Sequence, residues 1–509
     1  MAITLLLSWW SERKKTVLLV ILGTLATAVL VLGLGGYASA FTGIDPGVTD
    51  GMDYQEVIFV SGTPQVFKGT VKETVRERED SRQVTISYKL TEVGGDGKLT
   101  RSVKLTYTTE RSGTKEVQVM SLDGYTETLT LGKTTYKLDK DRLFFSGSQA
   151  LDRCPAVDFW TGNWYMKKVY VSGRGGRDRV TVETSGKSEG YSNSWGKGDT
   201  RVLDVSVQAE PSEGASWQGS ARIIMNDTVS RSLAYVTQGT QLASFAGGFV
   251  DEKRSEQVMT VEYDLPTAGS QGIEDQVRNR GTFELSSASL PQVKHLFLKE
   301  FKDLRNHWAK EAVESLCGLG ALDGEGTYFY PGLPARRADF VKAVVVVTGM
   351  TAENEQTKAR LARRGKNETE APVFLDVDAS SPYYEYAQIA GKKGLVEGKL
   401  FGPEDKMTRA EAAVLLVKAL GLENLSPGPG VTTGFYDDGL IPLWAKEAVY
   451  VAKEYGIIGG GRASGINFFR PNDIVTRAEM AAMVDRLRVF LDRDFSRDYR
   501  DRLYGFYHS

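Results

Sequence analysis

Hydrophobic and polar residues alternate along much of residues 50–290, as they do in strands with one buried face. Residues 84–90 show this period of two, with valine, isoleucine, tyrosine and leucine separated by polar residues. The same period recurs in four later runs: 103–107, 180–182, 202–207 and 258–263. Turn-forming residues separate the runs, and no stretch reads as a long amphipathic helix. The pattern predicts an antiparallel, β-rich region over residues 41–290, arranged as one or two sandwich-like domains.

The period changes to that of amphipathic helices in the last two-fifths of the chain, where one pattern occurs three times. Each copy has an aromatic-x-Asp opening, a helix, a glycine-rich turn, and a second helix that begins near an Arg-Ala-acid sequence. The spacing from opening phenylalanine to motif arginine is 36, 35 and 42 residues: Phe301 to Arg337, Phe374 to Arg409 and Phe435 to Arg477. The third copy therefore carries a loop insertion of about six residues. Because two such helices cannot bury an apolar face alone, we expect the copies to pack into one mainly α-helical body.

Two of the second helices begin with a capping box. Residues 408–411 and 476–479 both read Thr-Arg-Ala-Glu, in which the hydroxyl and the carboxylate satisfy free N–H groups at a helix start. A helix start favours anions, and an arginine there adds a fork that matches a carboxylate or phosphate. The repeated unit is therefore a candidate anion receptor, with solvated arginines that bind nothing as the alternative.

These motifs resemble the S-layer homology domain, whose repeats carry aromatic-x-Asp, His-Trp-Ala and Thr-Arg-Ala-Glu signatures. The resemblance implies a pseudo-trimeric arrangement of three helical repeats that holds exported proteins non-covalently on the bacterial cell wall. In this family the ligand is a secondary cell-wall polymer, an acidic and commonly pyruvylated glycan associated with peptidoglycan. The predicted boundaries are repeat 1 at 299–350, a charged linker at 351–372, repeat 2 at 373–423, repeat 3 at 434–490 and a charged tail at 491–509.

The resemblance also implies which side chains contact the polymer. Carried over by motif, they are Arg337, Arg409, Arg477, Trp308, Trp444, Asp303, Asp376 and Asp437. The first copy departs from the pattern, because Arg336 replaces the capping threonine and Asp339 replaces the glutamate. In the second copy residues 383–387 stand where His-Trp-Ala is expected, and in the third Leu443 replaces the histidine. The three grooves between repeats therefore need not all bind, and a place in the core is the alternative for the tryptophans.

The N-terminal residues have the pattern of an export signal. Arg13, Lys14 and Lys15 precede an uncharged apolar run from residue 16 to about 36, which the small-residue sequence at 38–40 follows. This order predicts a signal peptide over residues 1–40 that is cleaved after Ala40. The run is also long enough to span a bilayer, so an uncleaved N-terminal membrane anchor is the alternative. Both interpretations place the remaining chain outside the cell.

The few histidines and cysteines, and the balanced charge, exclude several kinds of functional site. The three histidines, His295, His307 and His508, lie outside the β-rich region, which excludes a Ser-His-Asp triad and histidine-ligated zinc there. The two cysteines, Cys154 and Cys317, cannot form a disulfide framework, and we expect both to be free thiols. With 63 basic and 65 acidic residues, nothing indicates a nucleic-acid partner.

Aromatic residues cluster at 159–165 in the β-rich region. Trp160 and Trp164 are four residues apart on one strand face, which indicates a place in the core, with stacking on sugar rings as the alternative. Trp195 and Trp217 lie in Gly/Ser-rich loops and are expected to be more exposed.

These patterns together predict an exported bacterial cell-surface or S-layer-associated protein, held on the wall by its three repeats. No catalytic, metal-binding or cofactor-binding residue is predicted, so the protein is expected not to be an enzyme. The alternative is a wall-anchored, carbohydrate-active enzyme with a carboxylate-dependent active site in the β-rich region. Self-association in a surface layer is a further hypothesis.

Overall fold

A computed structural model describes residues 44–495, apart from positions 50–52, 79, 174, 237–246, 270–271, 325, 352–371 and 464–465. These residues belong to one compact unit, Ala40–Ser509. The predicted signal peptide or anchor, nearly all of the charged linker and most of the charged tail lie outside the described residues. Within the part of the chain that the structure describes, no helix is long and apolar enough to cross a membrane.

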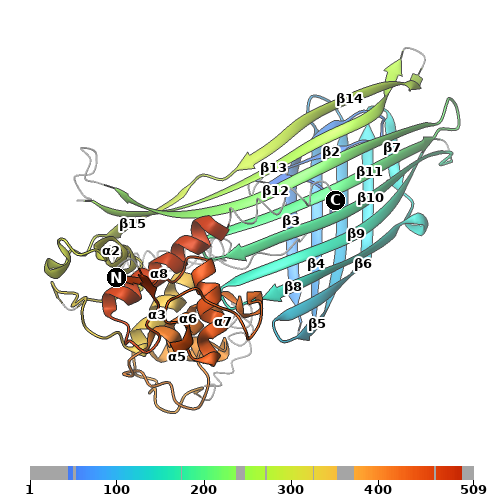
Figure 1. Cartoon of the computed structure of the whole chain (residues 1–509). Helices are drawn as coiled ribbons and strands as arrows, with labels where there is room; N and C mark the ends of the chain where they lie inside the picture. Colours follow the sequence, from blue (N-terminus) through green and yellow to red (C-terminus); the bar gives the residue numbers. More distant parts are fainter. Residues whose placement is uncertain are drawn as a thin grey trace, which may run out of the picture. The chain divides into compact units, whose positions relative to one another are not determined.

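The described residues of the β-rich region form a single antiparallel sheet, of fifteen strands, whose course Figure 1 shows. Most strands pair with their neighbours in sequence, while β8 pairs with β6 and β9, and β15 pairs with β13. The strands are β1 (Val48–Thr49), β2 (Tyr54–Ile58), β3 (Gln65–Glu77), β4 (Ser81–Glu92), β5 (Lys98–Ser112), β6 (Lys115–Leu131), β7 (Thr134–Leu138), β8 (Phe144–Arg153), β9 (Val157–Ser172), β10 (Asp178–Asn193), β11 (Gly196–Glu210), β12 (Trp217–Val236), β13 (Gly248–Gly269), β14 (Gly272–Ala288) and β15 (Gln292–Phe297). The region is therefore rich in antiparallel strands, as predicted. Its described strands belong to one hydrogen-bonded sheet, however, and do not form a sandwich of two separate sheets.

The sheet curls so that its two halves share a core. Val103 of β5 and Val261 of β13 are fully buried in the same apolar cluster, although these strands lie far apart in the pairing order. At the first strand, the Thr49 N–H donates to Oε1 of Gln257 on β13 (2.8 Å). One sheet thus provides both layers around its own core.

The tryptophans of the β-rich region lie in the core. Trp160 and Trp164 are both buried, which confirms the core interpretation of that aromatic cluster. Trp195 and Trp217 are also buried, so the prediction of exposed loop tryptophans is wrong for both. Loop composition indicated exposure, but the structure packs Trp195 against the helical part of the chain.

A cluster of charged residues is also buried inside the sheet. The guanidinium of Arg101 donates two bonds to Glu56 (2.7 and 2.9 Å) and one to Glu127 (2.6 Å). Asp45 lies 3.3 Å from the same guanidinium, and the ammonium of Lys168 lies 3.6 Å from Glu127. Burial opposes ionisation of Glu127, but the charges of Arg101 and Lys168 outweigh it and lower its pKa. The buried carboxylates are therefore stabilised by their ion pairs with Arg101 and Lys168.

The described residues of the helical part form six helices of eight residues or more, joined by short turns. The helices are α2 (Lys310–Gly318), α3 (Arg337–Thr348), α5 (Tyr384–Lys392), α6 (Arg409–Leu420), α7 (Leu443–Glu454) and α8 (Arg477–Val489), followed by the π-helical turn η6 (Phe490–Asp494). The 3-10 turns are η2 (Lys140–Arg142) in the sheet and η3 (Lys302–Leu304), η4 (Glu423–Leu425) and η5 (Asp438–Leu440) in the helical part. The insertion predicted in the third copy contains a short hairpin, β16 (Gly461–Ala463) and β17 (Ile466–Phe468).

The sheet contacts all three repeats at the ends of their second helices. Last-turn carbonyls of a helix have no partner within the helix, and here N–H groups of the sheet supply one. The three bonds run from Ala156 N to Ala419 O (2.9 Å), from Trp195 Nε1 to Val347 O (2.8 Å) and from Asn193 Nδ2 to Leu491 O (3.3 Å). Sheet and helices also share one apolar cluster. The two parts of the chain are thus packed together.

Cys154 and Cys317 are both free thiols, as predicted. Burial raises the pKa of each thiol to about 12. Both therefore stay protonated at neutral pH and are poor nucleophiles.

Candidate functional site

The starts of the second helices follow the sequence prediction. At α6 the hydroxyl of Thr408 accepts the Glu411 N–H (3.3 Å), and the Glu411 carboxylate accepts the Thr408 N–H (2.7 Å). The same capping box opens α8. At α3 the cap residue Arg336 makes no capping bond, and the shorter Asp339 binds the Arg336 guanidinium instead. The departure seen in the first copy therefore changes the local structure.

The three motif arginines join each repeat to the next. Each guanidinium donates to a phenylalanine carbonyl of another repeat: Arg337 to Phe401 O (2.7 Å), Arg409 to Phe469 O (2.7 Å) and Arg477 to Phe329 O (3.0 Å). The contacts run from repeat 1 to 2, from 2 to 3 and from 3 back to 1. Arg409 is the most enclosed, with 4% of its side chain exposed, and its burial lowers the pKa. These arginines hold the repeats together, and polymer contact through them stays a prediction.

Main-chain bonds follow the same cycle. The N–H groups of the motif arginines donate to the loop that precedes the second helix of the next repeat: Arg337 to Asp405 O, Arg409 to Asp473 O and Arg477 to Leu333 O (2.8, 3.0 and 2.8 Å). Three short bridges pair these loops with one another. The repeats therefore close a ring, because each second helix begins against its neighbour's loop.

The three repeat-opening aspartates also serve the fold. Each carboxylate accepts two main-chain N–H bonds: Asp303 from Phe329 and Tyr330, Asp376 from Phe401 and Gly402, and Asp437 from Phe469 and Arg470. The second residue of each pair has a positive φ, which is 58° at Tyr330, 63° at Gly402 and 58° at Arg470. Non-glycine residues adopt this conformation only at a cost. The aspartates thus hold a strained segment in place.

This segment is a motif that the sequence analysis missed. Each copy reads Phe-x-Pro, beginning at Phe329, Phe401 and Phe469, always eight residues before the motif arginine. The phenylalanine ring packs against the opening phenylalanine of its own repeat at centroid distances of 5.4 to 5.6 Å. The constant spacing was visible in the sequence and would have identified the segment.

The positive φ predicts opposite effects for two substitutions in equivalent positions. Arg470→Gly should stabilise the chain by up to about 1 kcal/mol, because glycine adopts this φ without steric cost. Gly402→Ala should destabilise it by at least about 1 kcal/mol, since the new Cβ would lie 2.0 Å from Asp405 Oδ2. The midpoints of urea unfolding of residues 41–509 measure both. A loss of stability in Arg470→Gly would show that its ion pairs with Asp473 and Glu479 outweigh the strain.

The two candidate tryptophans are on the surface. Trp308 is 65% exposed and Trp444 is 61% exposed, so a place in the core is wrong for both. Trp308 precedes α2, which packs against α8, and Trp444 lies in the first turn of α7, which packs against α6. Each tryptophan therefore belongs to a junction, a helix pair in which the second helix of one repeat meets the first helix of the next repeat.

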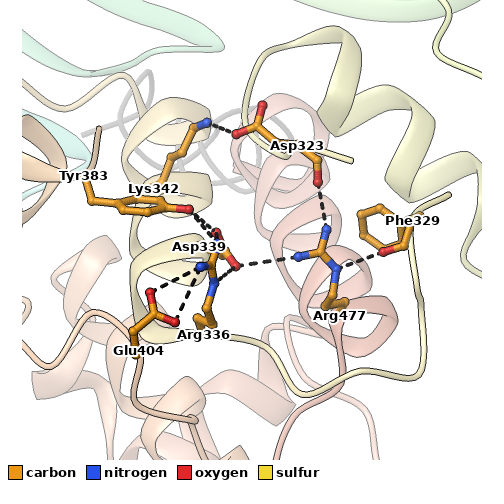
Figure 2. A network of polar contacts seen from close by, with 8 residues as sticks. All are labelled: Asp323, Phe329, Arg336, Asp339, Lys342, Tyr383, Glu404 and Arg477. Carbon is orange, nitrogen blue, oxygen red and sulfur yellow. Dashed lines mark hydrogen bonds and ion pairs between the residues drawn. The ribbon is translucent and has the colours of Figure 1, made fainter. Parts of the chain in front are cut away.

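The third such pair, α3 with α5, has a different composition (Figure 2). The Asp339 carboxylate accepts two bonds from Arg336 (2.9 and 3.0 Å) and one from the Tyr383 hydroxyl (2.8 Å). Nη1 of Arg477 lies 3.6 Å from the same carboxylate, and Arg336 also pairs with Glu404 (3.2 Å). Burial and the bond to Asp339 raise the pKa of Tyr383 to about 12. The Asp339 carboxylate is thus already the partner of the two arginines, Arg336 and Arg477, that lie at this junction.

The second repeat also lacks a tryptophan at the equivalent position. Gly320, Gly394 and Gly456 end the first helices with φ between 67° and 73°, which aligns the three copies. Counting back from these glycines, Pro382 takes the place of Trp308 and Trp444. The α3/α5 junction therefore differs from the other two in both its aromatic and its charged groups.

Three segments of the chain match the family model of the S-layer homology domain: residues 300–341, 373–413 and 435–481. The chain thus carries three S-layer homology domains, and they coincide with the three repeats that the contacts define. The spacing and motifs had predicted this family, and the prediction is confirmed.

Similar proteins include surface-layer proteins and a glycan-active enzyme. The chain is 29% identical to the surface-layer 125 kDa protein of Lysinibacillus sphaericus over 206 residues, which is 40% of this chain and 16% of that protein. It is 30% identical to S-layer protein EA1 of Bacillus anthracis over 194 residues, 36% of this chain and 20% of that protein. Over 193 residues it is 30% identical to exoglucanase XynX of Acetivibrio thermocellus, again 36% of this chain and 16% of the relative. The chain therefore spans a fifth or less of each, and the matches support a cell-surface location.

Proposed function

We propose that this chain is an exported surface protein whose repeats bind an acidic, pyruvylated secondary polymer of the cell wall. The observation that carries the proposal is the pair of exposed tryptophans at equivalent places in two junctions. Aromatic faces suit sugar rings, and the repetition of an exposed tryptophan at the same place in two repeats favours a shared role over chance exposure. We accordingly assign binding to the α6/α7 and α8/α2 junctions.

Each of these two junctions also has a cationic group that is partly open to solvent. Arg337 lies 3.8 Å from Glu411 at the start of α6, and its side chain is 22% exposed. Arg470 lies 3.8 Å from Glu479 at the start of α8, and about half of its side chain is exposed. A polymer carboxylate would gain a charged hydrogen bond from either group. At the α3/α5 junction the partly exposed arginine is Arg336, which differs in that Asp339 holds it with two hydrogen bonds and Glu404 pairs with it at 3.2 Å.

The double substitution Trp308→Ala/Trp444→Ala should weaken retention on purified cell-wall sacculi at least roughly tenfold, with a smaller loss for each single variant. Co-sedimentation of residues 41–509 with sacculi, before and after chemical removal of the secondary polymer, measures the effect. Phe297→Ala is the matched control, because Phe297 is 85% exposed and lies outside the repeats. Full retention of the double variant would exclude the tryptophans, and retention on polymer-free sacculi would point to another wall component.

The arginines are less suitable probes of binding. Replacing Arg409 or Arg477 by alanine removes bonds to carbonyls of a neighbouring repeat, so lost retention would not distinguish binding from folding. The tryptophans avoid this ambiguity because their side chains lie on the surface.

For the β-rich region we propose a non-enzymatic role, and the alternative is a carboxylate-dependent glycan hydrolase. Relatives named as enzymes, such as the exoglucanase above, match this chain through S-layer homology repeats, so these matches do not favour catalysis by the β-rich region. Release of reducing sugars from wall polysaccharides by residues 41–509 would favour the enzyme. Concentration-dependent assembly in light scattering would instead support self-association in a surface layer.

A further inference from the structure

The solvent-facing side of the sheet is hollowed over strands β9 to β14. The depression is shallow and open to solvent, with a volume of about 850 Å³. We call it the sheet hollow. Its margins include Tyr165, Glu183 and Arg222, with Glu262 and Arg280 on the far side. It lies in the β-rich region, apart from the tryptophans assigned to the wall polymer.

Cross-strand pairing explains why this surface is concave. Ser206 of β11 pairs directly with Ser220 of β12, and on either side of them are Glu183 and Asp264. Ser185 lies in the adjacent row, next to Tyr165. Side chains of directly paired residues stand side by side on one face. Short serines at the centre and longer side chains at the margins therefore leave a depression with a floor of hydroxyl groups.

An aromatic platform lies at one margin of the hollow. Tyr165 and Phe144 pack with centroids 5.9 Å apart, and Phe144 is 54% exposed. The Tyr165 hydroxyl bonds to Glu183, which Lys167 also holds at 2.8 Å. The tyrosine ring is thus fixed before any ligand arrives, which lowers the entropic cost of binding. Trp164, its neighbour in sequence, points to the core on the opposite face of β9.

The charges around the hollow largely cancel. Three of the four acidic lining residues are ion-paired: Glu183 with Lys167 (2.8 Å), Asp204 with Arg222 (3.6 Å) and Asp264 with Arg280 (2.9 Å). Among the described residues there is also no group of histidine, cysteine or carboxylate side chains suited to a metal ion. Little net charge remains to attract an ion, whereas hydrogen-bond donors and acceptors are abundant.

We propose that the sheet hollow binds a neutral oligosaccharide, with one sugar ring stacked on Tyr165 and its hydroxyl groups bonded to the serines and charged margins. Sugars combine an apolar ring face with many hydroxyl groups, which matches an aromatic platform beside a polar floor. The β-rich region would then bind a second glycan, chemically distinct from the acidic polymer assigned to the repeats.

The test uses residues 41–509 and three neutral probes, cellohexaose, xylohexaose and chitohexaose, in isothermal titration calorimetry. At least one hexasaccharide should bind, and Tyr165→Ala should weaken that binding at least roughly tenfold, as expected for loss of a central aromatic contact. Ser206→Trp should abolish binding by filling the hollow. Gln208→Trp is the matched control, because Gln208 is exposed on the same face of β11 but does not line the hollow.

Two outcomes would overturn the proposal: failure of all three probes to bind, or binding that Tyr165→Ala and Ser206→Trp leave unchanged. An equal loss in Gln208→Trp would also overturn it, because the effect would then not belong to the hollow. The variants' near-ultraviolet circular dichroism should match that of the parent chain. Trp308→Ala/Trp444→Ala should keep oligosaccharide binding, and Tyr165→Ala should keep sedimentation with sacculi, so the two sites can fail independently.

Discussion

Replacing Arg101 by methionine is expected to unfold the β-rich region or to lower its free energy of unfolding by about 3–5 kcal/mol. The guanidinium is 1% exposed and lies against Glu56, Glu127 and Asp45, which are equally enclosed. Without it, the three buried carboxylates would keep the hydroxyl bonds from Tyr54, Tyr125 and Tyr170. Lys168, 3.6 Å from Glu127, would be the cation that remains paired with them among the described residues. Uncompensated buried charge is among the most costly defects in a folded protein.

Urea unfolding of residues 41–509, followed by far-ultraviolet circular dichroism, measures this loss. Arg254→Met is the matched control, because Arg254 pairs with Glu252 on the surface, where solvent screens the pair and its contribution to stability is small. The loss of unfolding free energy in Arg101→Lys should lie between those of Arg254→Met and Arg101→Met. Lysine keeps the positive charge but cannot make two hydrogen bonds to Glu56 as the guanidinium does. An Arg101→Met variant as stable as the parent would show that the carboxylates are protonated or rearranged when the arginine is absent.

The sequence carried a signal for this cluster that the alternation analysis did not use. Arg101 occupies the buried face of β5, in step with Leu99 and Val103, and Glu127 is placed likewise between Tyr125 and Leu129 on β6. A charged residue at an inward position breaks the expected pattern and indicates a buried partner. Which partner it meets depends on strand register, because pairing decides which inward residues lie side by side.

Local signals predicted local structure well, and tertiary contacts account for what was missed. The boxes at Thr408 and Thr476 involve residues three apart in sequence, and both helices begin where the boxes place them. The arginine that follows each threonine was placed correctly at a helix start, but its partner is a carbonyl about 60 to 150 residues away. No spacing within one repeat could show that contact.

The sheet illustrates the same limit. Alternation identified strands and their buried faces, yet it could not distinguish two packed sheets from one sheet that curls around its own core. That difference depends on continuous hydrogen bonding from β1 to β14, and therefore on which strands are neighbours. The inward residues are apolar in both arrangements, so the pattern is the same.

Trp195→Ala is the second substitution with a large expected effect, because this side chain joins the sheet to two helices. Trp195 lies in the turn between β10 and β11, where its main-chain N–H donates to Asn193 Oδ1 (2.7 Å). Its indole N–H donates to Val347 O at the end of α3 (2.8 Å), and Arg488 of α8 lies 5.5 Å from the ring centroid. Arg231 of β12 lies against the same ring at 4.4 Å. Truncation would leave a cavity and would remove one of two bonds to Val347 O, the other of which comes from the Ser194 hydroxyl (2.9 Å). We expect a cost of about 3–5 kcal/mol, most of it from the cavity.

The variant should therefore uncouple the two parts of the chain as well as weaken them. We expect the parent chain to unfold in one transition, because sheet and helices share a core, and Trp195→Ala to unfold in two. Differential scanning calorimetry of residues 41–509 separates these cases. Trp308→Ala removes the same side chain from an exposed site and should change the midpoint by no more than the equivalent of about 0.5 kcal/mol. One transition with an unchanged midpoint in Trp195→Ala would mean that the remaining contacts, such as Ala156 N to Ala419 O, suffice to hold the sheet on the repeats.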